Sequence, residues 1–209
     1  MSAAVPFGHL TLDASLSALG RTLSASGDTS GLADSAFTPI ALYWNSGKVS
    51  FKFSETIMIP TGDYDVNRAL NMGLNRWGFD TVGAMTYFDP EKGLEASFAA
   101  GIMLNTENNA TDYKSGAEFH LDFTANKFFS QSFAAGIRGY YYHQLTGDSG
   151  SGAVLGDFKG EAFGIGPGFV WIPKFGGGNL AVTAKWVWDV YTVNRFDTQT
   201  GSVAVAWTF

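Results

Sequence analysis

A histidine and a carboxylate share one side of a segment near the middle of the chain. His120 and Asp122 stand two residues apart, so an extended backbone places both side chains on the same face. A histidine beside a carboxylate can orient a water molecule for hydrolysis. Both residues lie several positions inside an alternating segment, where packing among other polar side chains is the commoner role. We therefore weigh a hydrolytic site on His120 against a structural polar cluster, and we favour the cluster.

Other patterns that would indicate catalysis or metal binding are weak. Gly147-Asp-Ser-Gly150 is similar to the nucleophile segment of trypsin-like proteases, but a turn in a loop rich in Gly, Ser and Asp explains it better. The chain has no cysteine, and its three histidines lack zinc-ligand spacing. We predict no catalytic residue, no metal site and no cofactor.

The composition indicates one β-rich domain. The 209 residues include 26 glycines, 18 Phe, 8 Tyr and 6 Trp, and only 15% are charged, against roughly 25% in typical soluble domains. The formal net charge of −6 argues against nucleic acid as a partner, because nucleic acid requires basic patches. No apolar run approaches the roughly 18 residues of a membrane-spanning helix. The first residues have neither the basic nor the apolar region of a signal peptide.

Polar and apolar residues alternate with period two along most of the chain. Phe119 and Phe123, for example, alternate with His120 and Asp122. Such segments predict ten strands, at 7–23, 35–45, 48–59, 76–88, 93–105, 116–128, 132–145, 157–172, 179–191 and 200–209. Short turns alternate with longer loops, and the loops are expected at 24–34, 60–75, 106–115, 146–156 and 192–199.

This organisation is typical of outer-membrane barrels, which have long strands, short turns at one end and long loops at the other. Aromatic residues collect toward both strand ends, such as Trp77 and Tyr191 on the loop side and Trp44 and Trp171 on the turn side. The last residue, Phe209, ends an alternating strand in the manner of the signal that brings barrels to their assembly machinery. We predict an all-β, antiparallel up-and-down transmembrane barrel of about ten strands, formed by residues 1–209 as one domain in the outer membrane of a Gram-negative bacterium.

Several segments carry a resemblance to a known family. They are Pro60-Thr-Gly-Asp-Tyr-Asp65, Asn75-Arg-Trp77, Tyr87-Phe-Asp-Pro90, Asn108-Asn-Ala-Thr-Asp-Tyr113, Phe119-His-Leu-Asp122, Gly139-Tyr-Tyr-Tyr-His-Gln144, Asp148-Ser-Gly-Ser-Gly152, Gly166-Pro167 and Asn194-Arg195. In these residues the chain resembles the MetA-pathway-of-phenol-degradation family of outer-membrane proteins. The resemblance implies an outer-membrane barrel that passes small hydrophobic compounds and has no established enzymatic activity. Members of that family generally have a signal peptide and further N-terminal sequence, and the chain departs from this pattern at its start, so that the ten strands become twelve if an N-terminal hairpin is missing.

The polar side of each strand faces the lumen if the apolar side faces lipid. The predicted lumen residues are His9, Asp13, Lys52, Asp80, Glu95, Glu118, His120, Asp122, Arg138, Tyr140, Tyr142, Lys185 and Asp189. Two arrangements stay open. The charges pair across a narrow lumen and fill it, or they line a polar constriction in which Tyr140 and Tyr142 offer ring faces to a small aromatic solute. The two arrangements are compatible.

The longest loop holds the candidates for a gate, which are Asp63, Tyr64, Asp65, Arg68 and Arg76. Residues 66–73 predict a short helix capped by Asp65, and this loop either folds inward or lies outside as a solvated loop.

The strand around Pro167 presents glycines to the interior, at positions 160, 164, 166 and 168. They either leave a solute path or make room for neighbouring bulky side chains such as Tyr140 and Tyr142. Pro167 lacks a backbone donor, so we expect a bulge or a local break in the ladder there.

These patterns together predict passive passage of small hydrophobic or aromatic solutes. The expected partners are membrane lipid, the solute, and the barrel assembly machinery acting on the strand that ends at Phe209. Three alternatives remain: an outer-membrane hydrolase that uses His120, a plugged structural or ligand-binding barrel, and a soluble barrel with its apolar side inward.

Overall fold

The protein is described by a computed structural model that covers residues 1–18, 21–68, 70–175 and 178–208, and the side chains of these residues apart from 12–26, 174–179 and 208. The described residues form thirteen antiparallel strands and no helix. No helix long and apolar enough to cross a membrane is therefore found among them.

The strands differ greatly in length. They are β1 (Ser2–Ala4), β2 (Phe7–Ala18), β3 (Arg21–Leu32), β4 (Ser35–Ser46), β5 (Val49–Ile59), β6 (Gly78–Asp89), β7 (Leu94–Asn105), β8 (Glu118–Ser130), β9 (Phe133–Gln144), β10 (Glu161–Trp171), β11 (Lys174–Phe175), β12 (Gly178–Val193) and β13 (Gln199–Thr208). Most run longer than the roughly 5 to 6 residues that are usual in soluble proteins. Eleven of them form one sheet in the order β1-β4-β5-β6-β7-β8-β9-β10-β12-β11, with β13 also paired to β12.

The predicted segments from 35–45 onward correspond within a few residues to β4–β10, β12 and β13. The prediction for the N-terminal region is wrong. Instead of one strand at 7–23 and a loop at 24–34, β2 and β3 form a separate two-stranded sheet, with a register from Phe7 opposite Leu32 to Ala18 opposite Arg21. Residues 19 and 20, between the two strands, lie outside the described residues, and no cluster of polar turn residues marks that position in the sequence.

His9 and Asp13 consequently belong to the hairpin and not to the main sheet. The His9 Nδ1 atom lies 2.6 Å from the Ser30 Oγ atom on β3, the strand paired with β2. The side chain of Asp13 lies outside the described residues.

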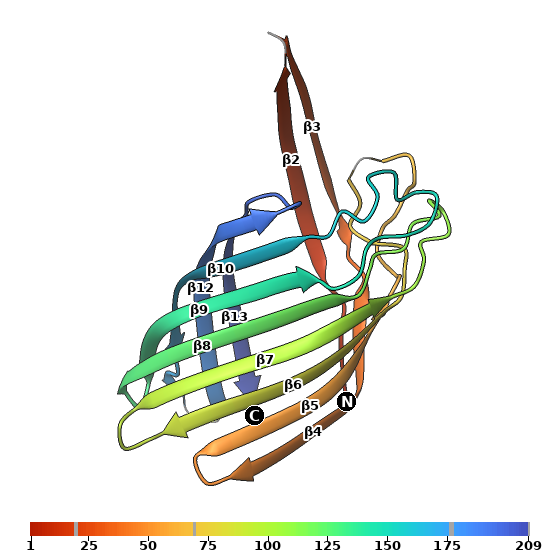
Figure 1. Ribbon diagram of the computed structural model, residues 1–209. Coiled ribbons are helices and arrows are strands. Elements are labelled where there is room, and N and C mark those ends of the chain that lie inside the picture. The colour runs from red at the N-terminus through yellow and green to blue at the C-terminus, as the bar shows by residue number, and fades with distance from the viewer. Residues whose placement is uncertain (19–20, 69, 176–177, 209) are drawn as a thin grey trace.

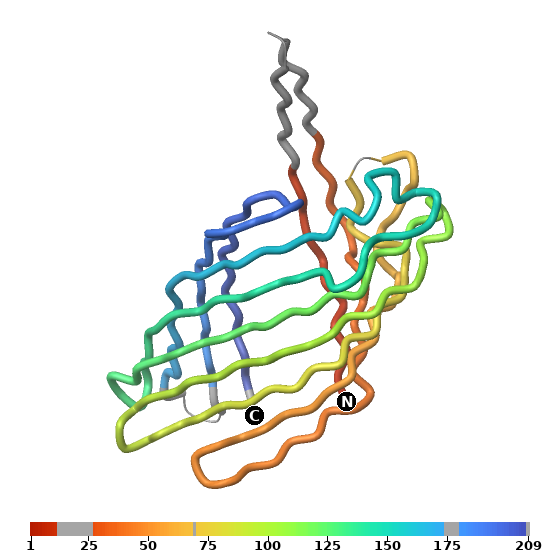
Figure 2. Tube along the Cα trace, viewed as in Figure 1, coloured from red at the N-terminus to blue at the C-terminus, as the bar shows by residue number. Residues whose placement is uncertain are grey.

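The short turns close tightly at one end of the main sheet. Ser46 of β4 pairs with Val49 of β5, so that only Gly47 and Lys48 lie between the two strands. Gly47 has a φ of 60°, a conformation that glycine adopts without the steric cost of a Cβ atom. The longer loops at 60–77, 106–117 and 145–160 gather together at the opposite end, as Figure 2 shows.

The cross-strand register divides the main sheet into two faces. One face carries apolar side chains such as Leu42, Phe98 and Ile137, which are all exposed. The other carries mostly polar or small side chains, among them the buried Ser54, Asn126 and Ala134. Figure 1 shows that the sheet curves, with β12 and β13 behind β8 and β9 in this view. We call the polar face the inner face and the apolar face the outer face.

The two long edge strands of this sheet are β13 and β4. β13 pairs with β12 alone in the described residues, and the free edge of β4 is covered only where Ala36–Thr38 pair with β1. The strands therefore form a curved antiparallel sheet, and the described residues show no ladder that closes it.

The expected irregularity near Pro167 is confirmed. The register between β10 and β12 shifts between Phe163 and Gly164, and its pairs stop at Ile165 and resume at Gly168. Pro167 keeps its pair with Ile137 of β9 on the other side. The interruption therefore affects one ladder only, as expected for a residue without a backbone donor.

Candidate functional site

All eleven predicted lumen residues from Lys52 to Asp189 lie on the inner face. The register carries this face across the sheet, since His120 is opposite Gly101 and Tyr142, and Gly164 is opposite Tyr140 and Asp189. The eleven are Lys52, Asp80, Glu95, Glu118, His120, Asp122, Arg138, Tyr140, Tyr142, Lys185 and Asp189. Period-two alternation therefore placed these side chains on one face.

The inner face borders a cavity of about 400 Å³. Its lining includes Thr86 on β6, Asp122 on β8, Arg138 on β9 and Lys185 on β12. Strands from β6 to β12 can border one space only where the sheet is concave. The polar side of the sheet is therefore the inside of the curve.

His120 is held by two carboxylates on this face. Its Nε2 atom lies 2.8 Å from the Asp80 Oδ1 atom and its Nδ1 atom lies 3.9 Å from the Asp122 Oδ2 atom. Asp80 and His120 come from β6 and β8, two strands apart, and the imidazole crosses the intervening β7 at Gly101, where a Cβ atom would overlap the His120 ring. His120 thus links β6 to β8 across β7 on the inner face.

A second polar chain joins β7, β8 and β9. The Asn126 amide donates to the Glu95 Oε2 atom at 2.9 Å and accepts from the Arg138 Nη1 atom at 2.7 Å. The other Glu95 oxygen accepts from Ser97 at 3.1 Å. Asn126 is 4% exposed, so this amide links an acid and a base inside the curve without direct contact between the two charges.

The glycines of β10 make room for side chains from the neighbouring strands. A Cβ atom at Gly164 would overlap the ring of Tyr140, and one at Gly168 would lie 2.8 Å from the Arg138 Cγ atom. The Tyr140 hydroxyl donates to Asp189 across Gly164. At Gly164 and Gly168 the space is thus occupied by bulky residues of β9, as in the second of the two interpretations of this strand.

A smaller polar space of about 320 Å³ lies at the loop end of the inner face. It is bordered by Glu118, Tyr142, Asp148 and two arginines, Arg76 and Arg195. Arg76 lies 3.8 Å from Glu118, and the Arg195 guanidinium stacks 4.0 Å from the Tyr142 ring centroid. Both arginines thus contact residues of the inner face from loop positions.

Lys52 lies apart from these clusters. It is on β5, next to the outermost long strand β4, and its Nζ atom lies 5.9 Å from the centroid of the Tyr43 ring. It does not belong to the lining of the 400 Å³ cavity.

The loop of residues 60–77 divides into two parts. Asp63, Asp65 and Asn67 are exposed, and Arg68 pairs with Asp63 at 2.8 Å. Met72, Leu74 and Arg76 border a space of about 340 Å³ together with Met103 and Glu118 of the sheet. The first part, with Arg68, therefore lies outside, and the second part, with Arg76, lies over the loop end of the inner face.

The predicted helix at 66–73 is wrong for the described residues of that range, which form only a turn at Val66 and Asn67. Asp65 does accept a hydrogen bond from the Asn67 N–H at 2.9 Å, but this caps a turn. A helix of eight residues is too short to be stable by itself. The two ends of the loop also cross closely, because a Cβ atom at Gly62 would lie 2.6 Å from the Gly73 Cα atom.

Three residues hold the loops in a way that the sequence analysis did not predict. Asp34, 7% exposed, accepts from the Gly62 N–H at 2.9 Å and the Leu74 N–H at 2.7 Å. Asn108 bonds Tyr64 at 3.0 Å and Asn75 at 2.8 Å. Asp148 accepts from the Tyr113 hydroxyl and from the Gly116 N–H. Asn108 and Asp148 stand in segments that carry the family resemblance, whereas no signal in the sequence marks Asp34.

Tyr113 shows the electrostatic effect of this loop network. Burial, together with the hydrogen bond and the negative charge of Asp148, raises the pKa of Tyr113 to about 12. The neutral phenol is favoured because it donates to a carboxylate in a poorly hydrated site.

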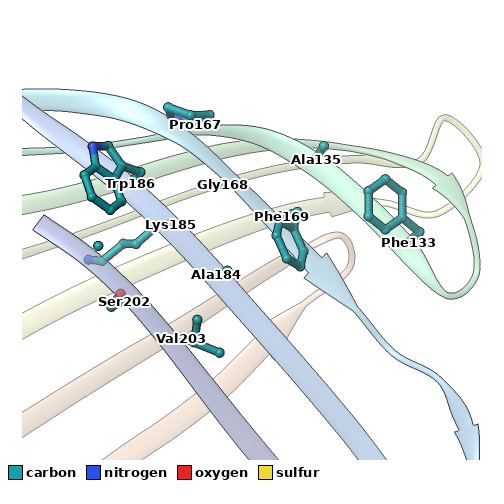
Figure 3. Close-up of a pocket in the computed structure, with 11 residues that line it drawn as sticks. Phe133, Ala135, Pro167, Gly168, Phe169, Ala184, Lys185, Trp186, Ser202 and Val203 are labelled. Carbon is teal, nitrogen blue, oxygen red and sulfur yellow. The ribbon is translucent and has the colours of Figure 1, made fainter.

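The outer face carries an apolar groove of about 640 Å³ over β9, β10, β12 and β13. Figure 3 shows Phe133, Phe169 and Trp186 around it, with the small Ala135 and Ala184 between them. Lys185 borders both this groove and the inner cavity.

Among the residues that the structure describes, no group of three or more His, Asp or Glu side chains could hold a metal ion. Phe209, on which the expected assembly signal depends, lies outside the described residues.

The fold thus combines a polar concave face, an apolar convex face and loops gathered at one end. A family model matches the sequence of the chain. The model described as "Putative MetA-pathway of phenol degradation" matches residues 1–205. The chain belongs to this family. The match extends over almost the whole sequence, including the N-terminal hairpin.

One solved structure resembles the chain over nearly all of its length. The crystal structure of the COG4313 outer membrane channel from Pseudomonas putida F1 superposes with a TM-score of 0.75 and 16% sequence identity, covering 98% of this chain and 74% of that one. This likeness shows a shared fold. No curated protein matches the chain.

Proposed function

We propose that this member of the phenol-degradation family closes into a transmembrane barrel in the outer membrane of a Gram-negative bacterium. A bilayer core offers no water to unpaired backbone groups, so spanning strands require a closed barrel. Closure joins the β13 side of the sheet to the β4 side, directly or through further strands. The outer face then contacts lipid, and the strand that contains Trp207 is presented to the assembly machinery.

We further propose that the inner face provides passive passage for small hydrophobic or aromatic solutes. The observation that carries this proposal is the continuous inner face, on which eleven polar side chains from β5 to β12 share one concave surface. The family's description as part of phenol degradation and the outer membrane channel of similar fold support it. In this account the loops collect the solute, the inner face selects it, and its concentration gradient drives it.

Uptake of radiolabelled toluene by porin-deficient Gram-negative cells tests the proposal. Cells that make the protein should take up toluene faster than cells that do not. Ser202, on the inner face of β13, and Val203, on its outer face, supply a matched pair of variants. Ser202→Trp should narrow the lumen and slow uptake, whereas Val203→Trp should leave it unchanged.

Folded barrels migrate differently on gels before and after heating, which checks that each variant is inserted. Folded, inserted protein without added uptake would mean a plugged barrel and would contradict the passage proposal. Failure of the chain to insert at all would contradict the barrel itself.

A further inference from the structure

Two cationic side chains lie next to each other on the inner face. Position 168 is a glycine, and the Arg138 side chain occupies the space that a larger residue there would need. A Cβ atom at Gly168 would lie 2.8 Å from the Arg138 Cγ atom and 3.2 Å from its Nε atom. Gly168 is directly opposite Lys185 in the ladder between β10 and β12. Side chains at directly opposite positions are roughly 5 Å apart at Cβ. Arg138 therefore occupies the position of a cross-strand neighbour of Lys185.

Most hydrogen-bond donors of these two side chains have no partner among the described residues. The Arg138 Nη1 atom donates to Asn126 at 2.7 Å and to the Ile137 carbonyl at 3.3 Å. Within the described ranges, neither the remaining guanidinium nitrogens of Arg138 nor the Lys185 Nζ atom has a hydrogen-bond or salt-bridge partner. Both side chains border the 400 Å³ cavity.

Two of the three nearby acids accept hydrogen bonds from other groups. Glu95 accepts from Ser97 and Asn126, and Asp189 accepts from Tyr140 and Thr198. Asp122 belongs to β8 and lies beside His120. Two like charges in a partly enclosed space repel each other, so the region between Arg138 and Lys185 favours an anion.

The rest of the cavity lining offers apolar surface to a small aromatic ring. Tyr140, Val170 and Val187 border it with ring and aliphatic surface, and its volume is in the range of sites for small molecules. A carboxylate matches the fork of a guanidinium with two parallel hydrogen bonds. Glu95 and Asp122, on β7 and β8, stand on the side away from Lys185 and disfavour a second negative charge.

We propose that the inner cavity binds the carboxylate of a small aromatic acid between Arg138 and Lys185, with the ring against Tyr140, Val170 and Val187. This inference rests on the passage proposed above and names a solute class for it. The acid is a monoanion, because the acidic side of the cavity opposes a dianion.

Saturation-transfer NMR on the folded protein in detergent tests the site without requiring conduction. Benzoate is the probe, and benzylammonium is a ring of similar size with the opposite charge. Benzoate should bind, benzylammonium should not, and added salt should weaken benzoate binding because ions screen partly exposed charges. Lys185→Gln should weaken benzoate binding about fivefold, the upper size of an exposed ion-pair effect.

Lys52→Gln is the matched control, because Lys52 is also an inner-face lysine but lies outside the cavity lining. It should bind benzoate as the unaltered protein does. Equal binding of benzoate and benzylammonium, or equal losses in both lysine variants, would overturn the proposal. Benzoate binding in a protein that passes no solute would uphold the site and refute the passage, so the two failures are distinguishable.

Discussion

The two halves of the inner face differ in how their charged side chains are satisfied. On β6, β7 and β8, Asp80 is held by His120, and Glu95 is held by Asn126 and Ser97. On β9, β10 and β12, glycines replace side chains, and within the described residues Lys185 has no polar partner. The charged groups of the first half are therefore paired within that half, whereas in the second half Lys185 and part of the Arg138 guanidinium keep free donors within the described residues.

The largest expected effect lies in the glycine half. Gly166→Ala should lower the free energy of unfolding by about 3 kcal/mol or more, because the added Cβ atom would overlap the Trp186 carbonyl oxygen of β12. Urea unfolding of the protein in liposomes, followed by tryptophan fluorescence, measures this loss. Gly83→Ala is the control, since a Cβ atom there has no neighbour within 4 Å, and it should change stability by less than about 0.5 kcal/mol. Equal effects of the two alanines would show that the close approach of β10 and β12 is unimportant.

The paired half should respond more moderately. His120→Ala removes the bridge to Asp80, whose side chain is only 16% exposed, and should cost about 2 kcal/mol of unfolding free energy, because a desolvated carboxylate loses its donor. Asp122→Ala should cost under about 0.5 kcal/mol, since that side chain is 61% exposed and 3.9 Å from the imidazole. The same urea titration compares the two. A small loss for His120→Ala would remove the distinction between the halves.

Asp34→Ala should destabilise the loop of residues 60–77 locally. This variant frees the Gly62 and Leu74 N–H groups, and one such bond is worth about 1 kcal/mol. Trypsin should then cut after Arg68 several times faster, which gel electrophoresis of a digestion series can follow. Asp197→Ala, in the loop between β12 and β13, should leave that rate unchanged. An unaltered rate in Asp34→Ala would mean that other contacts hold the loop.

The smallest expected effect concerns the pH at which the Tyr113 phenol ionises. Tyr113 has its pKa raised to about 12, above its value of about 10 in an unfolded chain. Its neutral form therefore contributes stability that is complete below pH 10 and is lost as the pH rises from 10 to 12. In an absorbance titration at 295 nm, Tyr113→Phe should remove a tyrosine that ionises near pH 12. If Tyr113→Phe instead removed a tyrosine that ionises near pH 10, the result would contradict burial of the phenol against Asp148.

Alternation predicted most of the sheet, because a strand with one apolar and one polar side repeats every second residue. It placed His120, Arg138 and Lys185 on one face correctly. It could not show that β2 and β3 are separate strands, because no cluster of turn residues stands between them. Nor could it find the bridge between Asp80 and His120, which depends on Gly101 lying between them in space. The role of Asp34 could not be predicted, because its partners are backbone N–H groups 28 and 40 residues away.

The central claim is that the inner face lines a passage across the membrane. The chain contains no cysteine, so a single introduced thiol reports one position. Thr183 borders the inner cavity, whereas its neighbour Val182 pairs with Trp171 and Val205 on the outer face.

Single-channel recording in a planar bilayer, with a charged methanethiosulfonate reagent added after insertion, is the most direct measurement. Discrete current steps are expected for both variants, and the reagent should reduce the current of Thr183→Cys and leave that of Val182→Cys unchanged. Folded, inserted protein without steps, or an equal response of the two variants, would contradict the claim.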